Sequence, residues 1–151
     1  MFSFIGNIEA RLDAKARVFV PAAFRKILQS AGQSELILRK DIFQNCLALY
    51  PLVVWEEEID RLRSRLNRWD KNQQQLFRRF VMDAERLELD ASGRILLPLR
   101  CRQLVGIESD ICFLGVDNII EIWTKEGLEQ AAASAESNFG DEIQRLMSNI
   151  Q

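Results

Sequence analysis

Apolar and polar residues alternate in several short segments of the chain. In residues 7–12, Ile8, Ala10 and Leu12 are separated by polar residues, which is the two-residue period of a strand with one buried face. Residues 13–16 begin with Asp13 and predict a turn, because an Asp side chain bonds the backbone just ahead of it. Other short segments rich in β-branched, aromatic or leucine residues predict strands at 17–20, 35–39, 46–50, 85–89, 94–97, 111–115 and 119–123.

Longer segments show the helical period. After Pro51, apolar residues recur at steps of three and four in a single stripe, formed by Trp55, Ile59, Leu62, Leu66 and Trp69. A polar stretch at 70–75 predicts a turn into a second, antiparallel helix that ends near residue 84. Such a stripe either packs on the core or contacts another molecule, and we favour the core. Shorter helices are predicted at 22–30, 98–105, 125–136 and 141–147.

One stretch of the chain occurs twice. Residues 12–28 superpose on residues 89–105 with a shift of 77, and six of the 17 positions are identical. Such a repeat predicts two similar half-units, each with too few strands to bury a sheet alone. We therefore predict a mainly β protein in which the halves pack into one pseudo-two-fold barrel with peripheral helices. The expected boundaries are 1–51 and 85–124 for the halves, 52–84 for a helical hairpin spacer and 125–151 for a helical tail.

Each copy of the repeat carries an Asp-led turn followed by an arginine. Arg17 and Arg94 stand just past the turns, and a guanidinium offers five donors suited to phosphate oxygens and guanine edges. Asp13 and Asp90 are expected to organise the loops, and Lys15 adds a loop cation. The plainer interpretation is that both turns are tight hairpins whose arginines pair with the neighbouring aspartates.

Composition narrows the function classes. The chain has 151 residues, 48% of them hydrophobic and 28% charged, which is typical of a globular protein. It has no histidine, so the commonest general base is missing, and without a CxxC pair we expect no metal site. No phosphate-binding glycine motif indicates a cofactor, and no catalytic residue is predicted. The three cysteines are expected to be reduced and packed, namely Cys46, Cys101 and Cys112.

Charge is unevenly distributed. The net charge of −2 argues against a wholly basic nucleic-acid binder. Residues 59–80, however, hold seven basic and two acidic side chains, a net of +5, whereas residues 125–151 hold two basic and five acidic ones, a net of −3. Such asymmetry permits a positive face on an acidic protein, although a basic helix is more often a solvated face. No apolar run reaches the roughly 18 residues that span a bilayer, so we expect a cytosolic protein.

The second copy of the repeat is similar to a known family signature. Asp90-Ala91-Ser92-Gly93-Arg94, followed by Pro98, resembles the Asp-x-x-Gly-Arg motif of MraZ proteins, whose halves are SpoVT/AbrB-like units. The resemblance covers nearly the whole chain. It implies a double-split, AbrB-like β-barrel in a cytoplasmic, nucleoid-associated and DNA-binding transcriptional regulator, which represses its own division and cell-wall gene cluster.

The same resemblance implies partners and contacts. The partners are double-stranded DNA with direct repeats in a promoter, and further copies of the chain in a ring-shaped homo-oligomer. Arg17, Arg94 and Lys15 would lie on the DNA. The resemblance implies no cofactor, no membrane and no small-molecule substrate.

The first motif departs from the pattern at one position. Ala16 stands where the second motif has Gly93, a residue that takes a positive φ at little cost. Either Ala16 adopts a positive φ at a cost on the order of 1 kcal/mol, or its loop takes another shape. We expect the Arg94 loop to keep the turn geometry of the family and the Arg17 loop to be the one that differs.

Two other classes of function stay open. One is a protein-interaction or scaffold module, including an antitoxin-like one, with weak or no specific DNA binding. The other is an enzyme that uses Asp13, Asp90 and Glu88 as paired carboxylates, but no residue pattern orders a nucleophile or cofactor around them.

Overall fold

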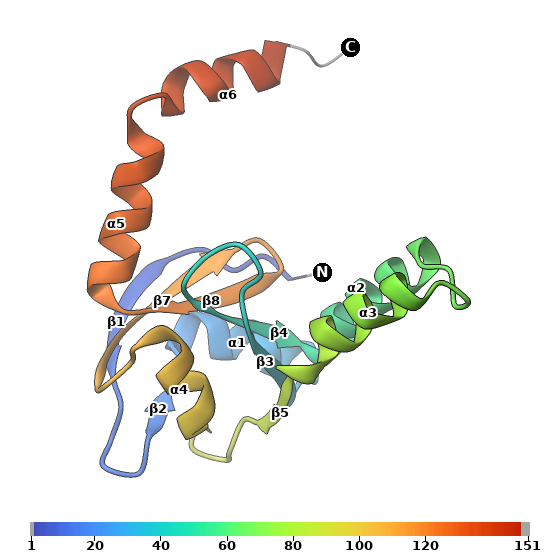
Figure 1. Cartoon of the computed structure of the whole chain (residues 1–151). Coiled ribbons are helices and arrows are strands. Elements are labelled where there is room, and N and C mark those ends of the chain that lie inside the picture. Colours follow the sequence, from blue (N-terminus) through green and yellow to red (C-terminus); the bar gives the residue numbers. More distant parts are fainter. Residues whose placement is uncertain (1, 149–151) are drawn as a thin grey trace.

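The computed structural model describes residues 2–148, so residues 149–151 of the predicted tail lie outside the described residues. The element order matches the one expected from the sequence (Figure 1). The strands are β1 (Asn7–Arg11), β2 (Arg17–Phe19), β3 (Glu35–Lys40), β4 (Leu47–Pro51), β5 (Glu85–Glu88), β6 (Arg94–Leu96), β7 (Asp110–Val116) and β8 (Ile119–Trp123). The helices are α1 (Ala22–Ser30), α2 (Leu52–Arg65), α3 (Lys71–Met82), α4 (Leu99–Val105), α5 (Lys125–Glu136) and α6 (Phe139–Ser148).

The sheet topology is pseudo-symmetric. Six antiparallel strands form one sheet in the order β1-β7-β8-β4-β3-β5, and β2 pairs with β6 in a separate ribbon. Exchanging each strand with its counterpart from the other half, β1 with β5, β3 with β7 and β4 with β8, only reverses this order. The exchange also maps the β2–β6 pair onto itself, so the halves are related by a pseudo-two-fold axis.

The two halves are interleaved rather than side by side. The first strand of each half pairs with the third strand of the other, β1 with β7 and β5 with β3. The backbone just after each first strand repeats this exchange, because Leu12 N donates to Ser109 O and Leu89 N donates to Ser34 O, both at 2.8 Å. Each half therefore completes the other, as expected for units with too few strands to stand alone.

The core lies inside the split barrel and consists mainly of strand residues. Their period-two alternation turns one side chain in two inward, as in β2, where Val18 is buried between the half-buried Arg17 and the exposed Phe19. Helices α1 and α4 close the barrel with a few buried side chains, such as Phe24 and Cys101. The prediction of packed thiols is confirmed, since Cys46, Cys101 and Cys112 are free and buried. The fold is thus a β core with peripheral helices, as predicted.

The helical hairpin α2–α3 projects from the sheet (Figure 1). Asp70 caps α3 by accepting hydrogen bonds from the backbone N–H groups of Asn72 and Gln73. The prediction that the stripe from Trp55 to Trp69 packs on the core is wrong for most of its length. The stripe is half-buried from Trp55 to Leu66, where Trp55 stacks on Phe80 of α3, and its last residue, Trp69, is 91% exposed. The hairpin reaches beyond the sheet, so only its base meets β3 and β4.

The C-terminal helices stand on the opposite side of the sheet from the β1–β2 loop (Figure 1). The base of α5 packs through Leu128 and Ala131 on a small cluster of Cys46, Cys112 and Trp123. Thr124 caps α5 by accepting a hydrogen bond from the backbone N–H of Gly127 at 3.0 Å. The chain bends after α5, and α6 lies apart from the sheet (Figure 1). Among residues 2–148, no helix is both long and apolar enough to span a bilayer.

Candidate nucleic-acid interface

The first candidate loop connects β1 to β2 and is organised by Asp13. Its Oδ1 accepts hydrogen bonds from the backbone N–H groups of Lys15 and Arg17, both at 2.9 Å. Its Oδ2 accepts from the side-chain Nε of Arg17 at 3.0 Å. Ala16 closes the turn at φ 63° and donates its N–H to Asp13 O at 3.0 Å. One carboxylate thus fixes both the loop backbone and the arginine that follows.

The second candidate loop, before β6, repeats this network. Asp90 Oδ1 accepts from the N–H groups of Ser92 and Arg94 at 2.9 and 2.8 Å, and Oδ2 accepts from Arg94 Nε at 3.1 Å. Gly93 has φ 87° and donates its N–H to Asp90 O at 3.0 Å. The expectation that the Arg17 loop would differ in shape is therefore wrong. Ala16 adopts the positive φ, because the Asp carboxylate holds the turn closed without glycine.

The β2–β6 ribbon brings the two loops together. Arg17 is opposite Leu96, and Phe19 is opposite Arg94. Residues directly opposite in an antiparallel pair share a face, so these four side chains lie on one side of the ribbon. The alternate residues, Val18 and Ile95, are buried on the other side. The ladder continues into both turns, since Val20 N donates to Gly93 O and Leu97 N donates to Ala16 O, each at 3.0 Å.

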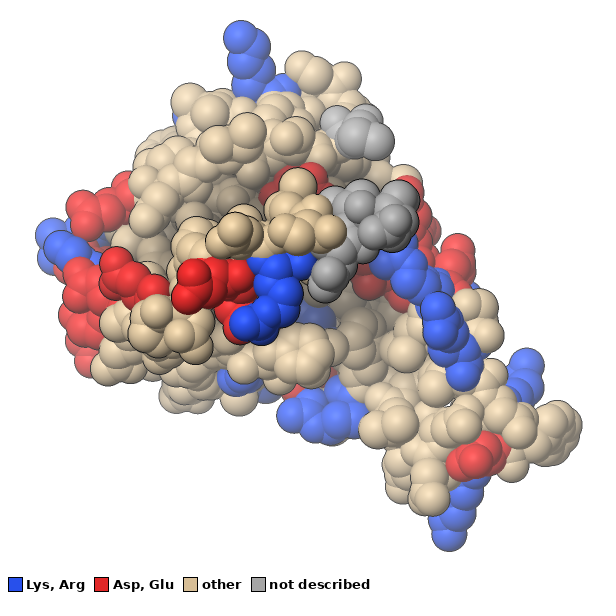
Figure 2. Space-filling view, turned by 90° about the horizontal axis from the view of Figure 1, so that it is seen from above, with Lys and Arg blue, Asp and Glu red and all other residues tan. Residues whose placement is uncertain are grey.

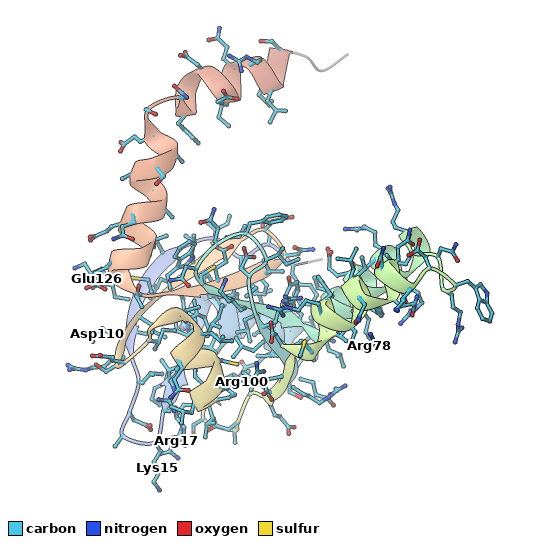
Figure 3. All side chains as sticks on the ribbon, viewed as in Figure 1. Lys15, Arg17, Arg78, Arg100, Asp110 and Glu126 are labelled. Atoms are coloured by element: carbon cyan, nitrogen blue, oxygen red, sulfur yellow. The ribbon has the colours of Figure 1, made fainter. Side chains whose placement is uncertain are left out.

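Each of the two arginines is held by only part of its guanidinium group. Each binds its own aspartate through Nε; among residues 2–148 the terminal nitrogens of Arg17 have no hydrogen-bond partner, and Arg94 has only the 4.0 Å ion-pair contact of Nη1 with Asp13 Oδ2. The expected Asp–Arg pairing is present, and it presents a fork suited to phosphate or guanine rather than concealing it. Lys15 is exposed in its loop and points away from the molecule beside Arg17 (Figure 3).

The aspartates are strong hydrogen-bond acceptors at this site. The backbone N–H of Arg17 is the largest influence on Asp13 and holds the pKa of its carboxyl below the usual value. The N–H of Arg94 lowers the pKa of Asp90 in the same way. Both carboxylates are therefore ionised at neutral pH, so each loop is a carboxylate–guanidinium pair, and Lys15 gives the first loop alone a net positive charge.

The surroundings of Arg17 and Arg94 differ in two respects. The guanidinium of Arg94 lies over the ring of Phe19, with 5.7 Å between its Cζ and the ring centroid, whereas Arg17 faces the aliphatic Leu96. Arg94 Nη1 also lies 4.0 Å from Asp13 Oδ2, which links the second loop to the first. Arg94 is consequently the more enclosed of the two, with 25% of its side chain exposed against 34% for Arg17.

Two further repeated arginines support the loops from the helices. Arg25 Nε donates to Val20 O at 2.7 Å, and Arg102 Nε donates to Leu97 O at 3.0 Å. Both acceptors are the residue before a proline, where the strand ladder stops. The repeat alignment already paired these arginines as identical, but it gave them no role. They fasten α1 and α4 to the ends of β2 and β6.

Figure 2 shows the face from which α5 and α6 rise, and basic and acidic side chains are intermixed on it rather than gathered into one patch. Among residues 2–148, no group of three or more His, Cys, Asp or Glu side chains is placed to hold a metal ion.

Fold and site together define a class of protein. It is a split β-barrel made from two interleaved copies of one half-unit, with paired Asp–Arg loops on a shared ribbon. A family model described as "MraZ protein, putative antitoxin-like" matches residues 3–79 and 80–150, one match for each half. The chain therefore belongs to the MraZ family.

Curated relatives agree over nearly the full length. The chain is 53% identical over 147 residues to the "Transcriptional regulator MraZ" of Bacteroides fragilis strain YCH46, with 97% of this chain and 92% of the relative aligned. It is 53% identical over 149 residues to the protein of the same name from Bacteroides thetaiotaomicron, covering 99% and 95%. The namesake from Flavobacterium psychrophilum is 32% identical over 150 residues, covering 99% and 95%.

Proposed function

We propose that this protein is a DNA-binding transcriptional regulator and that the β2–β6 ribbon is its DNA-reading surface. One observation carries the proposal: the ribbon holds Arg17 and Arg94 on one face, each fixed by its own aspartate through a hydrogen bond that uses Nε and leaves the terminal nitrogens to bind a ligand. Preorganised guanidinium forks match phosphate oxygens and guanine edges. The relatives named transcriptional regulators support the same function.

The finer mechanism follows from how little charge one protomer offers. Two loops with one additional lysine cannot bind DNA tightly alone, whereas a homo-oligomeric ring repeats them and raises avidity by orders of magnitude. Repeated loops would then bind direct repeats in a promoter, with Lys15 on phosphate and Arg17 and Arg94 on phosphate or base edges. Occupying the promoter of its own division and cell-wall gene cluster would repress it, in the cytoplasm and on the nucleoid.

Salt-titrated fluorescence anisotropy tests this proposal. The probe is a duplex from upstream of the protein's own gene, and a scrambled duplex measures non-specific binding. We expect Arg94→Ala to weaken specific binding by about 5- to 150-fold, since a lost base contact costs about 1–3 kcal/mol. Arg61→Ala on α2 is the matched control, because Arg61 is exposed and, among the described residues, pairs with Glu58 on its own helix. Equal affinity for Arg94→Ala and the wild type would remove the assignment.

A protein-interaction module, antitoxin-like or scaffolding, is the second candidate function. One observation favours it, namely the exposed apolar side chains of α6. This candidate would be favoured over the first if the protein retained a bound partner protein in a pull-down at physiological salt and had equal affinity for specific and scrambled DNA.

A further inference from the structure

Helix α6 exposes an apolar stripe that nothing in the described chain covers. Phe139, Ile143, Leu146 and Met147 follow one another at helical spacing and are 60%, 45%, 66% and 62% exposed. None of the extensive contacts between elements of residues 2–148 involves α6, and it stands away from the sheet (Figure 1). Isolated helices shorter than about 12–15 residues are marginal in water. A ten-residue helix of this kind therefore needs a partner for its apolar face.

A groove of complementary character lies on the helical hairpin. It is a hollow of about 520 Å³ between α2, α3 and the end of β3. Its apolar lining comes from Leu62 on α2, Leu76 and Phe80 on α3, and Ile42 in the loop after β3. Leu76 and Ile42 are 64% and 56% exposed, so the hollow presents apolar surface to water as α6 does.

The inner end of this groove holds a buried cation. Arg39 is only 4% exposed, and its guanidinium lies 4.4 Å from the ring centroid of Phe80. It donates to the carbonyl oxygens of Lys40 and Phe80. Two carboxylates also line the groove, but Asp83 is paired with Arg79 and Arg100, and Asp41 accepts from the backbone N–H groups of its own loop. Burial lowers the pKa of Arg39. A buried charge is costly unless a counter-charge accompanies it, so the groove is suited to a carboxylate beside apolar side chains.

Helix α6 carries such a carboxylate. Glu142 follows Phe139 by three residues and precedes Leu146 by four, so it borders the stripe. Its present partner is Arg145 at 3.1 Å, and both side chains are at least 60% exposed. An exposed pair of this kind contributes little and exchanges partners easily. Residues 125–151 carry a net charge of −3 and residues 59–80 a net charge of +5, so electrostatic attraction also favours contact between α6 and the hairpin.

We propose that α6 of one copy docks its apolar stripe into the hairpin groove of a second copy, with Glu142 facing the Arg39 end of the groove. The contact is head-to-tail, because stripe and groove are different surfaces of one chain, and such a contact closes into a ring or extends as a filament. The inference deepens the proposed function, since it names the surfaces that would join the copies, and its test needs no DNA.

A mixing experiment tests the head-to-tail contact. The stripe variant is Ile143→Asp/Leu146→Asp, and the groove variant is Ile42→Glu/Leu76→Glu; all four residues are exposed, so both variants should fold. Sedimentation velocity at micromolar concentration should find an oligomeric wild type and two monomeric variants. An equimolar mixture should form dimers, because the intact stripe of the groove variant fits the intact groove of the stripe variant.

A second pair of substitutions on α6 is the control for added charge. Gln144→Asp/Ser148→Asp adds the same charge to α6 away from the stripe and should keep the wild-type size. Glu142→Gln should weaken self-association by about tenfold, as expected when one partner of an interfacial charge pair is lost. Folded variants that keep the wild-type size, or a mixture that stays monomeric, overturn the proposal. A monomeric wild type whose groove binds dodecanoate would also overturn it, by assigning the groove to a small amphipathic anion.

The two proposals fail in different ways. If the docking contact is wrong, the sizes of the variants contradict it whatever their affinity for DNA. If DNA reading is wrong, the wild type assembles as expected but does not distinguish upstream from scrambled DNA.

Discussion

The two Asp–Arg loops differ in sequence and agree in geometry. The loop of residues 13–17 has Lys15 and Ala16 where the loop of residues 90–94 has Ser92 and Gly93. Both place one residue at positive φ, and the hydrogen bonds to the two aspartates agree within 0.1 Å. The aspartate and the arginine therefore define the loop, and the residue at positive φ is replaceable in principle.

The side chain packed against the second loop explains why that loop has glycine at residue 93. A Cβ on Gly93 would lie against the side chain of Arg25, with Nη1 at 2.8 Å. Arg25 cannot retreat freely, because its Nε holds Val20 O. Gly93 is thus needed for close approach as well as for its φ, whereas Ala16 carries its methyl group at φ 63°. The difference lies in packing from the neighbouring helix and not in the turn.

Substitutions at Ala16 and Gly93, the positive-φ residues of the two loops, give the largest expected effect on stability. Gly93→Ala should lower the free energy of unfolding by about 2 kcal/mol, from the strained φ and the displacement of Arg25. Ala16→Gly should raise it by up to about 1 kcal/mol, since the strain is relieved but the unfolded chain gains freedom. Urea denaturation followed by circular dichroism measures both changes.

Gly32→Ala separates strain from packing. Gly32 has φ 68° and open space around its Cβ position, so this variant measures strain alone. Gly93→Ala should cost more than Gly32→Ala, and the excess should disappear in an Arg25→Ala background. Equal costs at residues 32 and 93 would show that Arg25 does not require the glycine.

The repeat made much of this architecture predictable. Period-two segments located the strands, and the shared Asp, Arg and Pro located the two loops, because these residues act through their own backbone neighbours. The shape of the Arg17 loop was mispredicted since glycine was taken as the cause of the turn, whereas the carboxylate of Asp13 is. Local chemistry outweighed the intrinsic preference of one residue.

Long-range features were beyond the sequence pattern. The exchange of β1 and β5 between halves, and the supporting roles of Arg25 and Arg102, depend on residues far apart in the chain. The stripe around Trp69 has the period of a core helix, and periodicity alone does not tell which body a stripe packs on. Only the structure shows that the hairpin reaches past its own sheet.

Acid titration gives the next effect in size and should be equal for the two loops. The pKa of each aspartate is lowered in the folded state, so each contributes stability that is present above the unfolded pKa of about 3.9 and lost as pH falls through the folded value. Carbonyl-carbon NMR from pH 6 to 2 should find both pKa values below that of an unfolded chain.

Asparagine variants isolate the charge in this comparison. Asp13→Asn and Asp90→Asn keep an oxygen for the two N–H donors but lose the ionised group. Each should make stability less dependent on pH below about pH 4, and by a similar amount. A clear inequality between the variants would show that the loops are less alike than their geometry.

The smallest expected effect concerns the exposed loop cation, where the loops differ most in charge. If Lys15 lies on phosphate, Lys15→Ser should reduce the slope of log affinity against log salt concentration by about 0.9 per bound protomer. If the second loop lies on DNA in the same way, Ser92→Lys should increase the slope by the same amount, because the loop backbones match. The double exchange Lys15→Ser/Ser92→Lys should restore the wild-type slope. An unchanged slope for Ser92→Lys beside a reduced one for Lys15→Ser would mean that only the first loop follows the phosphate backbone, and that Arg94, stacked on Phe19, acts on DNA without a cation beside it.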